Sequence, residues 1–146
     1  MANSFALDVK AFADSFSEGA ERAVRSTVVN LSASFIDTSP VDTGRFKSNW
    51  FVTGQSPSTK IATSTDKSGQ KTKAAAEGKA LSIQDWSTFH ITNNLPYSEV
   101  IEFGRYGNGP DTIGGYSTQA PQGVVRVNIA RFNSLLNEEA AKRLPK

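Results

Sequence analysis

The chain has 146 residues and lacks cysteine altogether, with a single histidine and a single methionine. Without cysteine there are no disulfides and no thiolate metal sites, which suits folding in a reducing cytoplasm. No run approaches the ~20 apolar residues that a membrane span requires. The first four residues, Met1 to Ser4, lack the basic leader and apolar core of a signal peptide. We therefore predict one domain, residues 1–146, that folds without a covalent staple and has no membrane partner.

The first quarter of the sequence has the apolar periodicity of a long helix. Apolar residues recur there in steps of mostly three or four, at Phe5, Val9, Phe12, Phe16, Ala20, Ala23, Val28, Leu31 and Phe35. Asp8 is the expected N-cap, with Ser4 as a competitor, and Pro40 disfavours helix in the residue before it. The pattern predicts a helix over residues 8–35, about 40 Å long. Its apolar stripe, with three phenylalanines near its start, is most simply a core face; the alternative is a groove for a partner.

Short strands and helices are expected in the middle of the chain. Asp42 and Gly44 suit a tight turn, and residues 46–53 and 86–92 alternate as strands do. An alanine-rich segment, residues 73–83, predicts a short helix. A second short helix is expected over residues 97–103, with Pro96 before it and Gly104 ending it.

The last part of the chain carries two competing patterns. Residues 123–129 alternate as a strand would, but Val125, Ile129, Phe132, Leu136 and Ala140 step by three or four, and this continuity favours a helix that begins near Pro121. Long terminal helices with short strands between them predict an α+β fold. We expect a small, mainly antiparallel sheet packed against the N-terminal and C-terminal helices.

Two segments are too polar or too rich in glycine to be regular elements. Residues 54–72 are expected to be a mobile arm, because they have little apolar surface to bury. Lys60, Lys67 and Lys71 lie in this arm, and the simplest interpretation is a solvated loop. Contact with DNA phosphates or with an acidic neighbour is the alternative. Residues 104–119, which include Arg105, are expected to form a glycine-rich surface loop.

The sequence offers no positive evidence for catalysis. His90 is the single histidine, no nucleophile-elbow motif is present, and no paired metal-ligand spacing includes His90. Glu99 and Glu102 are three residues apart on a predicted helix, where a surface or interface role is the simpler interpretation. We predict no catalytic residue, no cofactor and no metal. A small hydrolase or metal enzyme that uses His90 and Glu102 remains the alternative from another class.

Two stretches together resemble one protein family. The first runs Ser-Pro-Val-Asp-Thr-Gly-Arg-Phe over residues 39–46. The second runs Asn-Asn-Leu-Pro-Tyr-Ser-Glu-Val-Ile-Glu-Phe-Gly over residues 93–104 and continues as Gly-Tyr-Ser-Thr-Gln-Ala-Pro-Gln-Gly over residues 115–123. In this order and spacing they resemble the neck and tail-completion proteins of long-tailed bacteriophages, the group of the lambda-type minor tail protein Z. Residues 105–114 look like an insertion relative to that pattern.

The resemblance implies a structural virion protein, assembled in the host bacterial cytoplasm, that forms a ring at the head–tail junction. It implies a six-fold homo-oligomer that contacts the tail tube protein and the head connector or stopper protein and leaves a lumen through which DNA passes. Another tail or connector component of similar fold is the alternative within the phage setting, and a non-specific DNA-binding module is an alternative outside it. Residues that match the family pattern are Asp42, Gly44, Arg45, Tyr97, Glu102, Gly104, Ser117, Gln119, Pro121 and Gly123. The candidate interface or DNA contacts are Lys60, Lys67, Lys71 and Arg105.

Physical roles can be assigned to several of these residues. Gly44 permits the turn, and the Asp42 side chain is expected to cap it. Tyr97 can bury its ring while its hydroxyl finds a partner. Gly104 is expected to have a positive φ at a helix end, and Gly123 to let backbones approach closely. These roles are compatible with a framework function as well as with an interface.

Overall fold

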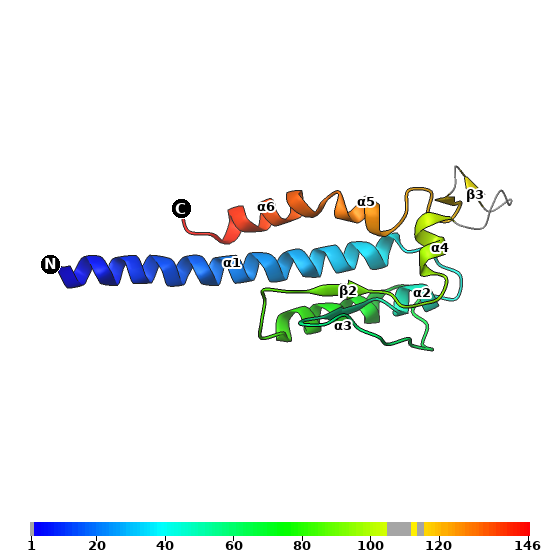
Figure 1. The fold of residues 1–146 in the computed structure, drawn as a ribbon, viewed down its shortest axis with the longest axis horizontal. Coiled ribbons are helices and arrows are strands. Elements are labelled where there is room, and N and C mark those ends of the chain that lie inside the picture. The colour runs from blue at the N-terminus through cyan, green and yellow to red at the C-terminus, as the bar shows by residue number, and fades with distance from the viewer. Residues whose placement is uncertain (1, 105–111, 114–115) are drawn as a thin grey trace.

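A single long helix organises the fold. The computed structural model describes residues 2–104, 112–113 and 116–146. Helix α1 (Ala2–Thr38) is its longest element. Helices α5 (Val125–Ile129) and α6 (Phe132–Arg143) lie along one side of α1, and helix α3 (Gln70–Ser82) with a two-stranded sheet lies along the other (Figure 1). The predicted α+β class, with an antiparallel sheet between long terminal helices, is confirmed.

Helix α1 is longer than its apolar pattern predicts. At 37 residues it extends about 55 Å. Neither predicted N-cap is correct, because Ser4 and Asp8 both lie inside the helix. At the other end Thr38 and Ser39 donate their hydroxyls to the carbonyls of Ser34 and Phe35. These side-chain hydrogen bonds satisfy carbonyls of the last turn just before Pro40.

The sheet is shorter than the sequence predicts. Strands β1 (Phe51–Thr53) and β2 (His90–Thr92) pair antiparallel, with Val52 opposite Ile91. The first half of the predicted 46–53 strand is instead helix α2 (Arg45–Ser48). The local reason is the turn at Gly44, whose carbonyl accepts the N–H of Ser48 and so closes a helical turn. The first half of the predicted 86–92 strand is also not a strand.

The remaining elements follow the predicted order. Helix α3 begins three residues before the predicted start, and helix α4 (Ser98–Phe103) ends at Gly104 as expected. A small hairpin, β3 (Thr112–Ile113) with β4 (Tyr116–Ser117), follows. The choice of helix over strand after residue 123 is confirmed, although a break at Ala130 and Arg131 divides the predicted single helix into α5 and α6.

The core gathers around the C-terminal half of α1. Ile36 is fully buried, and Phe35 packs on Trp50 with ring centroids 5.1 Å apart. Phe46 meets the same indole edge-on at 5.8 Å. Further residues of this cluster include Val52, Ala76, Ala80, Leu95, Ala120 and Val124.

The N-terminal half of α1 has no such cover. Residues 4–18 are all exposed, and the exposed fraction is 73% for Phe5, 56% for Phe12 and 47% for Phe16. The interpretation of this stripe as a core face is therefore wrong for residues 5–16 and correct from Ala23 onward. The boundary lies where α6 ends, because a Cβ on Gly19 would clash with the carbonyl oxygen of Arg143. Beyond that point α1 projects alone (Figure 1).

Candidate functional site

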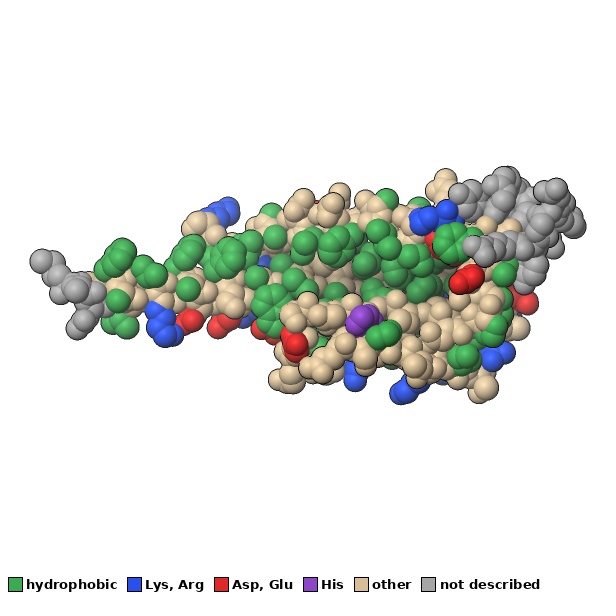
Figure 2. Space-filling model, in the orientation of Figure 1, with side chains coloured by type: hydrophobic (Ala, Val, Ile, Leu, Met, Phe, Trp, Pro, Cys, Tyr) green, Lys and Arg blue, Asp and Glu red, His purple; other side chains and the backbone are tan. Residues whose placement is uncertain are grey.

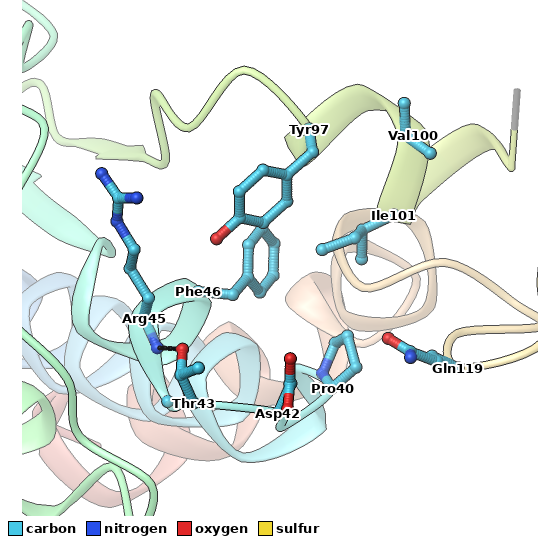
Figure 3. Close-up of a pocket in the computed structure, with 10 residues that line it drawn as sticks. Pro40, Asp42, Thr43, Arg45, Phe46, Tyr97, Val100, Ile101 and Gln119 are labelled. Atoms are coloured by element: carbon cyan, nitrogen blue, oxygen red, sulfur yellow. Dashed lines mark hydrogen bonds between the residues drawn. The ribbon is translucent and has the colours of Figure 1, made fainter. Parts of the chain in front are cut away.

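The two sequence motifs that are separated by about fifty residues meet in one pocket. Its volume is about 280 Å³. Residues from the turn after α1, from α4 and from the segment before α5 line it together (Figure 3). The lining residues are Pro40, Asp42, Thr43, Gly44, Arg45, Phe46, Tyr97, Val100, Ile101 and Gln119.

The turn at Gly44 is built on a conformation that favours glycine. Gly44 has φ +87°, and a Cβ there would lie 2.5 Å from the backbone nitrogen of Lys67. The expected cap by Asp42 is instead made by Thr43, whose Oγ1 accepts the Arg45 N–H at 3.2 Å. Asp42 is exposed at the pocket rim. The turn is thus held by backbone packing, which leaves the Asp42 side chain exposed.

Tyr97 and Arg45 both line the pocket, Tyr97 at the top and Arg45 at the left of the view in Figure 3. Tyr97 directly precedes α4, is half-buried, and lies 6.2 Å from the Phe46 ring between centroids. Arg45 is also half-buried, and its Nε is enclosed without a hydrogen-bond partner among the described residues.

Glu102 joins α4 to the start of α5. Glu102 is only 7% exposed. Its carboxylate accepts hydrogen bonds from the backbone N–H groups of Val124 at 2.6 Å, Val125 at 2.7 Å and Arg126 at 3.0 Å. The Arg126 Nε donates to the same carboxylate at 2.9 Å. The Arg126 guanidinium lies 5.0 Å from the centroid of the Phe103 ring. Glu102 therefore satisfies donors at a helix start that no intrahelical carbonyl can reach.

The protonation state of Glu102 follows from these contacts. Burial raises the pKa of the carboxyl, but the hydrogen bonds from Val125, Arg126 and Val124 and from the Arg126 side chain outweigh it, so the pKa lies below its ordinary 4.5. Glu102 is consequently an ionised structural anchor at neutral pH.

Two glycines shape the segment around this anchor. Gly104 ends α4 with φ +66°, as predicted. Gly123 has φ +77°, and a Cβ there would lie 2.5 Å from a carboxylate oxygen of Glu102. The expected close approach of two backbones at Gly123 is therefore wrong, because the nearest contact is the side-chain carboxylate of Glu102. Pro121 is exposed four residues before α5 begins.

The other predicted positions lie near the pocket or outside the described residues. Gln119 is exposed and lines the pocket. Ser117 belongs to β4, where it pairs with Thr112. Arg105 and the centre of the glycine-rich loop lie outside the described residues.

The predicted arm is tied to the domain at several points. Its last three residues, 70–72, form the first turn of α3. Asn49 exchanges hydrogen bonds with the backbone of Ala62, at 2.7 and 3.1 Å. Asn94 donates to the carbonyls of Ser58 and Lys60, at 2.7 and 3.1 Å. Side-chain amides thus supply backbone partners that the composition of the arm does not indicate.

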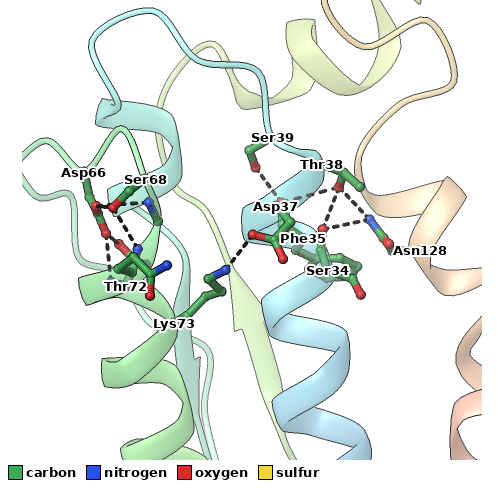
Figure 4. A network of polar contacts seen from close by, with 12 residues as sticks. Ser34, Phe35, Asp37, Thr38, Ser39, Asp66, Ser68, Thr72, Lys73 and Asn128 are labelled. Carbon is green, nitrogen blue, oxygen red and sulfur yellow. Dashed lines mark hydrogen bonds and ion pairs between the residues drawn. The ribbon is translucent and has the colours of Figure 1, made fainter.

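Asp66 lies four residues before α3 begins, and its side chain accepts hydrogen bonds from the start of that helix. It accepts the N–H of Gly69 at 3.0 Å and both the N–H and the hydroxyl of Thr72 at 2.9 Å (Figure 4). Desolvation raises the pKa of Asp66, yet these hydrogen bonds together lower it below its ordinary value. Nearby, Lys73 pairs with Asp37 of α1 at 2.8 Å. The predicted contact residues Lys60, Lys67 and Lys71 are all exposed.

Within the described part of the chain, the residues that could bind a metal ion do not form a metal site. No group of three His, Cys, Asp or Glu side chains there is placed to hold an ion. His90 is half-buried in β2, opposite Thr53. Glu102, the proposed helper of His90 in an enzyme, is occupied by the start of α5. Among the described residues, the helices also include none with the length and apolar character needed to cross a bilayer.

Two buried asparagines whose side-chain amides join distant segments were not predicted from the sequence. Asn128 is 1% exposed and donates to Thr38 Oγ1 at 2.7 Å, which ties α5 to the end of α1 (Figure 4). Asn49 is fully buried in the turn after α2. A signal was present, since Asn49, Asn93 and Asn94 flank the short strands, where amide side chains commonly close turns. Their long-range partners could not be inferred from spacing.

Comparison of the chain with protein-family models, with curated proteins and with solved structures finds no match in any of the three.

Proposed function

We propose that this protein is a structural subunit of a long-tailed bacteriophage virion. It forms a ring, six-fold in the simplest case, that completes the tail and joins it to the head connector or stopper protein. Its other neighbours are copies of itself and the tail tube protein, and DNA passes through the ring. The subunit is made in the host bacterial cytoplasm and functions in the virion.

One observation carries the proposal: the two motif stretches that resemble the family form one surface feature. The turn at Asp42–Gly44 from the first stretch lines one pocket together with Tyr97 and Gln119 from the second. Framework residues of the same motifs, Glu102 and Gly123, also lie against each other.

The exposed groups around the pocket fit a protein–protein contact. Asp42 and Gln119 are both exposed and line the pocket. Exposed polar side chains of this kind are typical of the rim of an interface. Catalysis through Glu102 is disfavoured because its carboxylate already accepts four hydrogen bonds.

The direct test is removal of the gene from the phage that carries it. The expected result is full heads and separate tails that do not join, with joining restored by the wild-type gene in trans. Mass spectrometry of purified virions should detect the chain, and electron microscopy should place it at the neck. Virions that lack the chain, or normal joining after deletion, would contradict the proposal.

A point substitution separates the pocket from the fold. Asp42→Arg reverses an exposed charge at the pocket rim, so the subunit should fold normally but complement the deletion at least ten-fold less well. Glu138→Arg makes the same kind of change at an exposed position of α6 and serves as the control. Equal complementation by both variants would show that the pocket is not part of the contact. The role in the virion would still be tested by the deletion.

A further inference from the structure

The projecting half of α1 carries an apolar seam with the spacing of a coiled coil. Phe5, Val9, Phe12 and Phe16 follow one another in steps of four, three and four, which places them at alternating d and a positions of a heptad. The Phe12 and Phe16 rings lie 6.4 Å apart between centroids, so they share one face. Figure 2 shows apolar side chains gathered along this end of the molecule.

Further along the helix, the same seam is buried within the chain. The next two positions in the repeat are Gly19 and Ala23, and both are buried. Gly19 lies against the carbonyl of Arg143, at the last residue of α6. The face that α6 covers within the chain therefore continues, uncovered, over residues 5–16. An occupant of the free part would lie end to end with α6.

We propose that this free seam binds the same seam of a second copy, with the two helices antiparallel. Reversal maps the seam onto itself: Phe5 of one copy meets Phe16 of the other, and Val9 meets Phe12. Each large residue thus faces an apolar partner, as a two-fold contact requires.

The residues that flank the seam fit this arrangement. On one side Ala6 faces Ala13 of the second copy, and these small side chains let the helices approach closely. On the other side Asp8 faces Ser15, whose hydroxyl can donate to the carboxylate. Lys10 and Asp14 lie outside the seam, where they form an ion pair at 2.6 Å, so neither charge is placed at the contact.

Orientation is set by the end of α6. A parallel, in-register pair would bring Gly19 of each copy toward Gly19 of the other, but that place is taken by Arg143. In the antiparallel pair the N-terminus of the incoming helix instead approaches the C-terminus of α6.

The charge of the projecting segment argues against a lipid surface. Residues 4–18 contain one basic residue, Lys10, and three acidic residues, Asp8, Asp14 and Glu18, which give a net charge of 1 − 3 = −2. Helices that lie on anionic membranes carry lysine and arginine on the polar face. A second copy of this chain needs no such charge.

The size of the seam predicts a weak dimer. A phenylalanine side chain buries roughly 150–250 Å² when fully covered, and those of the seam are about half to three-quarters exposed. The pair then buries on the order of 800 Å² in total, below the ~1,200 Å² of stable interfaces. We expect a monomer–dimer equilibrium with a micromolar dissociation constant. The contact is separate from the pocket used in the proposed function and does not depend on it.

Sedimentation equilibrium across a concentration series tests the pairing. The wild-type chain should shift from monomer to dimer, and Phe12→Ser should raise the dissociation constant at least ten-fold. Leu7→Ser is the matched control, because Leu7 is 66% exposed on the same helix but outside the seam, and it should leave the equilibrium unchanged. A wild-type chain that stays monomeric at millimolar concentration, or equal effects of both variants, would overturn the proposal.

Engineered thiols test the orientation, since the native chain has no cysteine. A short thiol–thiol cross-linker should join Ala6→Cys to Ala13→Cys when the two single variants are mixed, and each variant alone should give little product. Efficient cross-linking of each variant with itself would indicate a parallel pair and overturn the antiparallel arrangement. Flotation of wild-type protein with anionic vesicles, without self-association, would assign the seam to lipid and overturn the proposal as well.

Discussion

The two halves of α1 have the same apolar periodicity and opposite surroundings. From Ala23 to Ile36 the apolar face is buried under α3, α5 and α6, whereas from Phe5 to Phe16 it meets solvent. Periodicity reports which residues share a face of a helix. It does not report what covers that face, and for residues 5–16 the described part of the chain supplies no cover.

The difference has an energetic consequence. An isolated helix of fifteen or so residues is marginal in water, and the exposed phenylalanines of the projecting half gain little burial in the monomer. The covered half is stabilised by packing on several elements. Substitutions in each half, and in the elements that cover one of them, should therefore change the stability of the monomer by different amounts.

Phe35→Ala and Phe12→Ala make the same chemical change in the two halves. Phe35 is 4% exposed against Trp50, so its truncation should lower the free energy of unfolding by about 3–5 kcal/mol. Phe12 is 56% exposed, so its truncation should change the monomer by no more than about 0.5 kcal/mol. Urea unfolding at low protein concentration measures both. A loss above about 2 kcal/mol for Phe12→Ala would show that the projecting half is packed in the monomer.

Glu102→Gln weakens the anchor that holds α5 over the covered half. The substituted side chain would present an amide where three backbone N–H groups and Arg126 donate, so we expect a loss of about 1–3 kcal/mol. Glu99→Gln, at an exposed position of the same helix, is the control and should stay within about 0.5 kcal/mol. Equal effects of the two variants in thermal unfolding would contradict the anchoring role.

The pH dependence of Glu102 has a defined sign. Because its folded pKa lies below the ordinary value of 4.5, its contribution to stability is present above that value and is lost as the pH falls through the folded pKa. The difference in free energy of unfolding between wild type and Glu102→Gln should therefore be constant near neutral pH and shrink below pH 4.5. A difference that grows on acidification would exclude an ionised Glu102 in the folded protein.

Local patterns predicted most of the elements, and tertiary contacts account for most of the errors. The α+β class, the short helix closed by Gly104 and the helical C-terminal segment all follow from spacing and from glycine chemistry. Part of the strand expected at residues 46–53 is α2, because the Gly44 carbonyl accepts the N–H of Ser48; the same carbonyl accepts the N–H of Asp66, a contact between distant residues. Propensity cannot anticipate such a contact.

The site shows the same division. Gly44, Gly104 and Gly123 were assigned special roles in the backbone from the sequence, and each has a positive φ. Sequence spacing did not show that Glu102 binds the start of α5, or that Asn128 ties α5 to α1. Both depend on side chains that reach across long sequence separations, for which a single sequence holds no signal.

Gly19→Ala alters the boundary between the two halves, with Gly78→Ala as its matched control. Both glycines lie inside helices, where alanine gains about 0.5–1 kcal/mol. At Gly78 an added Cβ would meet nothing within 4 Å, so the full gain is expected. At Gly19 the new methyl would clash with the Arg143 carbonyl oxygen, and displacing the end of α6 should outweigh the gain, for a net loss of about 1–2 kcal/mol. Changes of opposite sign in the free energy of unfolding, measured with urea, would establish that α6 packs on α1 at Gly19. A gain in stability for both variants would show that the covered half begins closer to Ala23.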